Sequence, residues 1–326
     1  MSLVKRRRAM QVSARSTMCR PFMPGRKTIE VCMIKDTSEA NKAPERERRF
    51  ARVIHYNLSY IVQGLKFGTD GAIVLLHDIV AGAFVWADVM PHLASLKRAV
   101  YAIDLLGYGE SDHPWPADTS NWGQADGLNM LFEQLKLTNI ILVGHGFGGS
   151  VAQVLATRLS RERVAALVLI DSTCYEHSFA ENWPLPEMKK RQDYDAPKET
   201  KVEDMIRDLS ETLPYGSVNP QRFQVFMSDY IDQWNSELGK EVLFQQIRLL
   251  NPNYTNSVAS DLKVLRRPVL IVWGEKDQQT PLKLAQRLHR DIPESRLVII
   301  PDAGHLVLFD APEAVGSTLV DFIKGL

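Results

Sequence analysis

Six short apolar runs, each followed by a helical or loop-forming stretch, constrain the fold of this chain more than any other feature. The runs resemble strands that are buried on both faces, and they lie at residues 72–76, 99–103, 140–143, 167–170, 269–273 and 297–300. Helical patterns occupy residues 83–96, 121–135, 148–159, 281–289 and 312–324. Strands and helices that alternate in this way predict an α/β fold with a mostly parallel, doubly wound sheet covered by helices on both faces.

The intervals around these elements set the expected domain limits. Apolar alternation over residues 49–62 predicts an antiparallel strand pair at the start of the sheet. The segment between the fourth and fifth apolar runs is too long for a crossover and has a mixed helical pattern, so we expect a helical lid at residues 172–265. The core of the fold then comprises residues 49–171 and 266–326.

The first 48 residues differ from the rest of the chain. Residues 1–27 contain eight Lys and Arg residues and no acidic residue, with no apolar core of a secretory signal. Such a segment can be an organelle transit peptide, but we favour a solvated tail or an upstream start in place of Met33. Because it is polar and dense in charge, we predict that residues 1–48 form a disordered extension.

Charge and cysteine content restrict the partners. Lys plus Arg equals Asp plus Glu at 39 each, so no net field attracts nucleic acid or an anionic membrane. No apolar run is long enough to span a bilayer. Cys19, Cys32 and Cys174 lack metal-site or disulfide spacing, which fits a reducing cytoplasmic setting, with organelle targeting as the alternative. We find no dinucleotide or Walker motif. We therefore expect a small-molecule substrate or ligand, no cofactor and no metal, and the oligomeric state stays open.

Polar residues follow the predicted strands at the points where functional residues of a parallel sheet are expected. Ligands bind such sheets outside the carboxyl ends of the strands. In chain order the segments there contain His77-Asp78, Asp104, Gly144-His145-Gly146-Phe147-Gly148, Asp171, Asp277 and His305.

From about residue 49 to the C-terminus, this order resembles the α/β-hydrolase fold superfamily, and epoxide hydrolases, haloalkane dehalogenases and esterases in particular. Residues 144–148 match its nucleophile elbow, a strand-to-helix turn that exposes the nucleophile. The resemblance implies that His305 is the catalytic base and Asp277 its acid partner. Asp171 is the alternative acid, because some members of the superfamily place the acid after that strand.

Two residues depart from the pattern of that superfamily. Gly146 stands at the nucleophile position and has no side chain that could attack a substrate. Asp78 follows His77 where the superfamily usually has Gly, whose bare backbone lets an N–H group reach an oxyanion. An ionised Asp78 would oppose negative charge there, so both departures argue against ordinary ester hydrolysis. Burial in an apolar pocket would instead raise the pKa of Asp78 and make it a general acid.

The remaining residues of these segments have less specific expected roles. His145 and Phe147 flank the elbow and, with His77 and Asp78, are expected around the oxyanion region and the pocket. Asp104 is expected to cap a loop. Asp277 and His305 could also form a pair that only holds two loops together.

Three functional hypotheses follow. In the favoured one, an enzyme acts on a small apolar molecule through the Asp277–His305 dyad, as a hydrolase or as a cofactor-independent lyase or oxygenase, with His305 as general base. In the second, the chain is a catalytically inactive ligand-binding pseudoenzyme that keeps the lidded pocket. In the third, it is an ordinary hydrolase whose nucleophile lies elsewhere, for example at Ser172 or Cys174.

Overall fold

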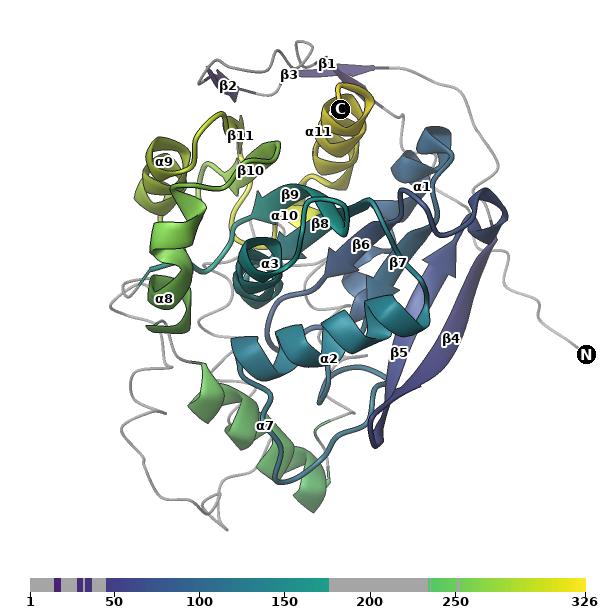
Figure 1. Cartoon of the computed structure of the whole chain (residues 1–326). Coiled ribbons are helices and arrows are strands. Elements are labelled where there is room, and N and C mark those ends of the chain that lie inside the picture. Colours follow the sequence, from purple (N-terminus) through teal and green to yellow (C-terminus); the bar gives the residue numbers. More distant parts are fainter. Residues whose placement is uncertain are drawn as a thin grey trace, which may run out of the picture.

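The computed structural model describes residues 15–18, 28–31, 33–36, 45–175, 234, 236–250 and 253–326 (Figure 1). Its strands are β1 (Arg15–Met18), β2 (Thr28–Val31), β3 (Met33–Asp36), β4 (Arg46–Val53), β5 (Tyr56–Gln63), β6 (Ile73–Leu76), β7 (Val100–Ile103), β8 (Ile140–His145), β9 (Val164–Ile170), β10 (Val269–Gly274) and β11 (Arg296–Ile300). The α-helices are α1 (Met90–Leu93), α2 (Asn121–Gln134), α3 (Phe147–Arg158), α7 (Glu237–Leu249), α8 (Asn253–Leu262), α9 (Leu282–Asp291), α10 (Val307–Asp310) and α11 (Pro312–Lys324).

Nine of the strands form one sheet in the order β2-β11-β10-β9-β8-β6-β7-β5-β4, and β1 pairs with β3. Neighbouring strands from β2 to β7 are parallel, whereas β5 is antiparallel to both β7 and β4. The predicted mostly parallel sheet and the antiparallel pair at its start are therefore confirmed. β7 and β8 lie on opposite sides of β6, so the strand order reverses at β6, near the middle of the sheet. The parallel strands direct their carboxyl ends to one edge there.

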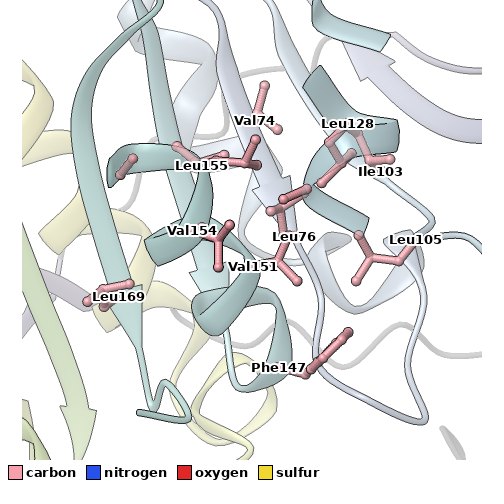
Figure 2. Close-up of a cluster of buried hydrophobic side chains, with 14 of the residues drawn as sticks. Val74, Leu76, Ile103, Leu105, Leu128, Phe147, Val151, Val154, Leu155 and Leu169 are labelled. Carbon is pink, nitrogen blue, oxygen red and sulfur yellow. The ribbon is translucent and has the colours of Figure 1, made fainter. Parts of the chain in front are cut away.

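The central strands are apolar throughout because the sheet separates two hydrophobic cores. Successive side chains of a strand point to opposite faces. Val74 and Leu76 of β6 belong to one core, with Val151 of α3, whereas Ile73 and Leu75 belong to the other core, with Phe322 of α11. Figure 2 shows the first of these cores, in which Leu76, Val151 and Val154 lie between β6 and α3. The two layers of helices hold the strand ends, and hence the loops that follow them, in fixed positions.

The helical stretch predicted at residues 83–96 is confirmed only in part, because it is not one continuous helix. That stretch forms two short 3-10 turns, Ala83–Trp86 and Ala94–Leu96, with the single-turn helix α1 between them. Pro91 lies in the first turn of α1. Proline lacks the backbone N–H that an interior helical position would donate, and its ring clashes with the preceding turn, so it is tolerated only at a helix start. The helical patterns at residues 121–135, 148–159, 281–289 and 312–324 correspond to α2, α3, α9 and α11.

The predicted domain limits fall partly outside the described residues. Within residues 1–48 the structure places β1, β2, β3 and the start of β4, with β2 parallel to β11 at the edge of the sheet. Within residues 172–265 it places α7, α8 and Trp234, and residues 176–233, 235 and 251–252 are not described. Trp183, which like Trp234 is expected from the sequence to lie in the core of the lid, belongs to the part that is not described. The division into extension, core and lid stays a prediction.

Trp234 is fully buried and packs edge-on against Tyr108, as expected for a side chain of the hydrophobic core. α7 contacts the loop after β7, where Gln246 Nε2 lies 3.4 Å from the carbonyl oxygen of Leu106. Among the helices that the structure describes, none is long and apolar enough to cross a membrane.

Candidate active site

Four loops at the carboxyl edge of the sheet bring the predicted site residues together. Asp78 follows β6, Gly146 follows β8, Asp277 follows β10 and His305 follows β11. All four lie in the described part of the chain, and the side chains of Asp78, Asp277 and His305 are buried.

His305 lies between two carboxylates. Its Nδ1 is 2.9 Å from Oδ2 of Asp277, and its Nε2 is 3.0 Å from Oδ2 of Asp78. Both ring nitrogens can donate only when the ring is protonated, so this geometry favours an imidazolium. Burial alone would lower the pKa of His305, but the charges and hydrogen bonds of Asp277 and Asp78 outweigh it and raise that pKa well above its ordinary value.

Asp277 is held by the loop that follows it. Its Oδ1 accepts hydrogen bonds from the backbone N–H groups of Gln279 and Thr280, each at 2.8 Å. Thr280 Oγ1 donates to Oδ2 of Asp277 at 2.5 Å and lies 3.1 Å from Nδ1 of His305. Thr280 is not among the site residues that we expected from the sequence. An Asp followed three residues later by Thr is a local hydrogen-bonding pattern that could have indicated it.

Gly146 has the strained backbone of an elbow. It connects β8 to α3 with φ 52° and ψ −118°, a conformation that glycine adopts at little cost. A Cβ atom at this position would lie 2.0 Å from Cγ of Asp78 and 2.1 Å from its Oδ1. The carboxyl group of Asp78 therefore occupies the space that the side chain of an elbow residue would need.

Asp78 also occupies the donors that the resemblance assigns to an oxyanion. Its Oδ1 accepts hydrogen bonds from the backbone N–H of Phe147 at 2.5 Å and from that of Ile79 at 2.7 Å. One of these donors follows the elbow position and the other lies in the loop after β6, which are the two sources of an oxyanion hole in this kind of site. Ile79 is not among the residues expected from the sequence, because it contributes through its backbone N–H and its side-chain type gives no indication of that role.

The expected rise in the pKa of Asp78 is wrong. Burial does act to raise the pKa of Asp78, but the hydrogen bond and charge of His305, together with the Phe147 N–H, outweigh it and lower that pKa below its ordinary value. The site therefore holds Asp78 as a carboxylate beside a protonated His305, and Asp78 has no proton to give as a general acid.

The two neighbouring histidines, His77 and His145, are neutral and form hydrogen bonds with backbone groups. Burial lowers the pKa of His145 to about 4, so Nε2 of the neutral ring donates to the carbonyl oxygen of His305 at 2.8 Å. Burial also lowers the pKa of His77. Its Nε2 accepts from the Leu105 N–H at 3.0 Å, and its Nδ1 donates to the carbonyl oxygen of Asp78 at 2.6 Å. His77 and His145 thus fix the loops that contain Asp78 and His305.

Asp171 and Asp104 lie behind the site. Oδ1 of Asp171 accepts the Gly274 N–H at 2.8 Å, and burial, together with the nearby charge of Asp277, raises the pKa of Asp171 well above its ordinary value. Asp277 rather than Asp171 contacts Nδ1 of His305. Asp104 accepts from Arg48 and from the backbone N–H of Ala83, which fits the expected loop-capping role.

Ser172 and Cys174, the alternative nucleophiles of the third hypothesis, do not have the surroundings of an activated nucleophile. Ser172 Oγ accepts from Nε2 of Gln153 at 3.0 Å and lies 3.1 Å from the carbonyl oxygen of Thr173. Cys174 is fully buried, and burial raises the pKa of its thiol. A buried, protonated thiol is a poor nucleophile.

Asp78, His145 and His305 also form a cluster of potential metal ligands, with one donor atom of each within 4.8 Å of the others. Their contacts favour a proton over a metal ion. Nε2 of His145 contacts a carbonyl oxygen, and both nitrogens of His305 contact carboxylates. The cluster is thus satisfied as a hydrogen-bonded ion pair.

Comparison with known proteins agrees with this architecture. The sequence profile of the alpha/beta hydrolase fold family matches residues 71–312, so the chain belongs to that family. It is 25% identical over 270 residues to the uncharacterized hydrolase YugF of Bacillus subtilis, covering 77% of this chain and 89% of the relative. It is 27% identical over 267 residues to a 2-hydroxy-6-oxo-2,4-heptadienoate hydrolase of Pseudomonas putida, covering 78% and 90%.

A solved structure shares the same fold. The haloalkane dehalogenase DbeA of Bradyrhizobium elkani superposes with a TM-score of 0.73, at 19% identity, over 86% of this chain and 98% of that one. At this identity the likeness speaks for the fold alone. The predicted fold class is confirmed, and the chain is related to hydrolases of small molecules.

Proposed function

We propose that this protein is a hydrolase of a small apolar molecule that works through the Asp277–His305 dyad without a nucleophile at the elbow. The contact between Nδ1 of His305 and Oδ2 of Asp277 at 2.9 Å carries this proposal. It orients Nε2 toward the elbow, where Oδ2 of Asp78, from the loop after β6, lies 3.0 Å away. An imidazole held in this way exchanges a proton with a substrate or with water.

The occupied oxyanion site selects against esters as substrates. Acyl transfer requires donors aimed at the oxygen that becomes negative in the transition state. Here the N–H groups of Ile79 and Phe147 already bind Oδ1 of Asp78. Substrates whose reaction needs no external oxyanion site, such as epoxides or alkyl halides, fit this site better.

The same ion pair favours a second function, ligand binding without turnover. His305 is already paired with two carboxylates, and Gly146 supplies no attacking group. A protein of this kind would bind a small apolar ligand in the pocket that we expect beneath the lid, and would release it unchanged.

Turnover measurements separate the two functions. The unmodified protein, His305→Ala and the matched control His55→Ala, which alters an exposed histidine, are assayed against an activated ester, an aryl epoxide and an alkyl bromide. We expect turnover of the epoxide or the bromide, lost on the order of 10²–10⁴-fold in His305→Ala and kept in His55→Ala. Turnover that survives in His305→Ala contradicts the proposal. No turnover, together with ligand-dependent rises in melting temperature, supports the binding function instead.

A further inference from the structure

We infer that Asp78 is a nucleophile relocated from the elbow to the loop after β6, and that it attacks a saturated electrophilic carbon, in the first place a ring carbon of an epoxide. This inference rests on the proposed function and names its attacking group and substrate class. The carboxylate of Asp78 already lies at the elbow, so the loop after β6 does not need to move.

The position of the Asp78 carboxyl group supports its role as the nucleophile. Cγ of Asp78 lies 2.0 Å from where a Cβ atom of residue 146 would be. The reactive group of Asp78 thus emerges at the point where an elbow side chain would present its own. The Asp78 side chain is also more open than that of His305, with 11% of its surface exposed against 3%.

The two carboxylate oxygens of Asp78 have different surroundings, which also supports this role. Oδ1 is anchored by two backbone N–H groups, from Ile79 and Phe147. Oδ2 has the contact with Nε2 of His305 at 3.0 Å. A carboxylate that is fixed through one oxygen keeps the other in a defined direction, which is what a positioned nucleophile requires.

The proton that ring opening requires can come from His305. As Oδ2 bonds to the ring carbon, the carbon–oxygen bond of the epoxide breaks, and the alkoxide formed takes the proton from Nε2 of His305. The products are a hydroxyalkyl ester on Asp78 and a neutral His305. His305 enters this step protonated because two carboxylates flank it, so the resting ion pair supplies the acid for ring opening.

The same groups then release the product. Neutral His305 takes a proton from water, and the hydroxide adds to Cγ of the ester, so negative charge develops on Oδ1. That oxygen already faces the N–H groups of Ile79 and Phe147, which stabilise it. The Cγ–Oδ2 bond of the intermediate breaks, the departing alkoxide takes the proton that His305 has received from water, and the new carboxyl group then gives its own proton to the neutral His305. Epoxide plus water gives a diol, and the water oxygen stays on Asp78.

Isotope labelling tests this route directly. The unmodified protein, in excess over styrene oxide, is allowed one turnover in H₂¹⁸O, and the peptide that contains Asp78 is analysed by mass spectrometry. We expect one ¹⁸O in Asp78 and an unlabelled diol. Label in the diol and none in Asp78 overturns the inference while the proposed hydrolase function stands.

Trapping the ester gives a readout that does not require turnover. His305→Gln removes the base but not the nucleophile, so an alkyl bromide, whose leaving group needs no proton, should leave one alkyl group per chain on Asp78. Asp78→Asn should prevent the adduct, and Asp126→Asn, which alters an exposed carboxylate, should not. An adduct in a protein without turnover supports the nucleophile and contradicts the hydrolase function. No adduct on Asp78 from the bromide or the epoxide overturns the inference.

Discussion

Asp78 and His305 each set the ionisation of the other. The lowered pKa of Asp78 owes most to the hydrogen bond from His305, and Asp78 is one of two carboxylates that raise the pKa of His305. Because both side chains are buried, water screens this interaction little. The pair is therefore a matched unit, and a change to either residue should be measurable at its partner.

Replacing Asp78 by Asn should lower the pKa of His305. Asparagine keeps the size of the side chain but removes one of the two negative charges that favour the imidazolium. The pH titration of the His305 ring resonances by NMR measures this shift. Asp126→Asn is the control and should leave the titration unchanged, because Asp126 is exposed and paired with Arg158. An unchanged titration in Asp78→Asn would mean that the two side chains are not in contact in solution.

At the scale of elements, the turn between β8 and α3 and the loop after β6 share one volume. A side chain at residue 146 and a carboxylate at residue 78 cannot both occupy it, because the Cβ–Cγ distance would be 2.0 Å. Close packing also requires glycine at residue 148, where a Cβ atom would lie 2.5 Å from the carbonyl oxygen of His77. Substitutions in the two segments should therefore not be additive.

Gly146→Ser alone should lower the free energy of unfolding by about 1–3 kcal/mol, because it overpacks the site against Asp78. Adding Asp78→Gly should remove the overlap and free the N–H groups of Ile79 and Phe147 for an oxyanion. We expect the double variant to hydrolyse p-nitrophenyl acetate at least about 10²-fold faster than either single variant. Urea unfolding and an ester assay on all three variants measure both effects. Additive stabilities, with no gain of ester hydrolysis, would contradict the shared volume.

The packing of α3 on the sheet should dominate the stability of the elbow. Leu155 is 2% exposed and lies in the core that Figure 2 shows. Leu155→Ala should lower the free energy of unfolding by about 2–5 kcal/mol. Leu238 of α7 is 53% exposed, so Leu238→Ala should change stability by no more than about 0.5 kcal/mol. Equal losses in the two variants, measured by chemical denaturation, would mean that α3 is not packed as described.

At the scale of the whole molecule, the buried groups of the site make stability depend on pH. The pKa of His305 is higher in the folded protein than in the unfolded chain, so its contribution is complete below the ordinary histidine value and is lost as the pH rises through the folded value. The raised pKa of Asp171 acts in the same direction from about pH 4 upward. The lowered pKa values of His145 and His77 act in the opposite direction below about pH 6.5, and offset Asp171 there.

We therefore expect the free energy of unfolding to fall as the pH rises above about 6.5, by up to about 1.4 kcal/mol per pH unit for each of His305 and Asp171. His305→Gln should make this alkaline decline less steep. Below about pH 4, stability should fall again as Asp78, whose pKa is lowered on folding, becomes protonated. Denaturant unfolding at several pH values measures both declines. An alkaline decline of equal slope in His305→Gln would contradict the raised pKa.

The sequence was sufficient for the sheet and for the positions of the site residues, but not for their contacts. Apolar runs report burial directly, and chain order then places Asp78, Gly146, Asp277 and His305 at one edge. The sequence predicts the wrong direction for the pKa shift of Asp78, because burial and the charge of His305 oppose each other and only distances decide between them. At residues 83–96 the apolar spacing predicts one helix, but Pro91 is tolerated only in the first turn of a helix and therefore interrupts it.

The exclusion between residues 78 and 146 also restricts the order in which this site could arise. From a relative with a side chain at the elbow, aspartate at residue 78 is accommodated only after, or together with, the change to glycine at residue 146. Once both are in place, a single step back at residue 146 meets the Asp78 carboxyl group. A side chain can therefore return to residue 146 only after, or together with, a change at residue 78, so the same overlap fixes the order of the two substitutions in both directions.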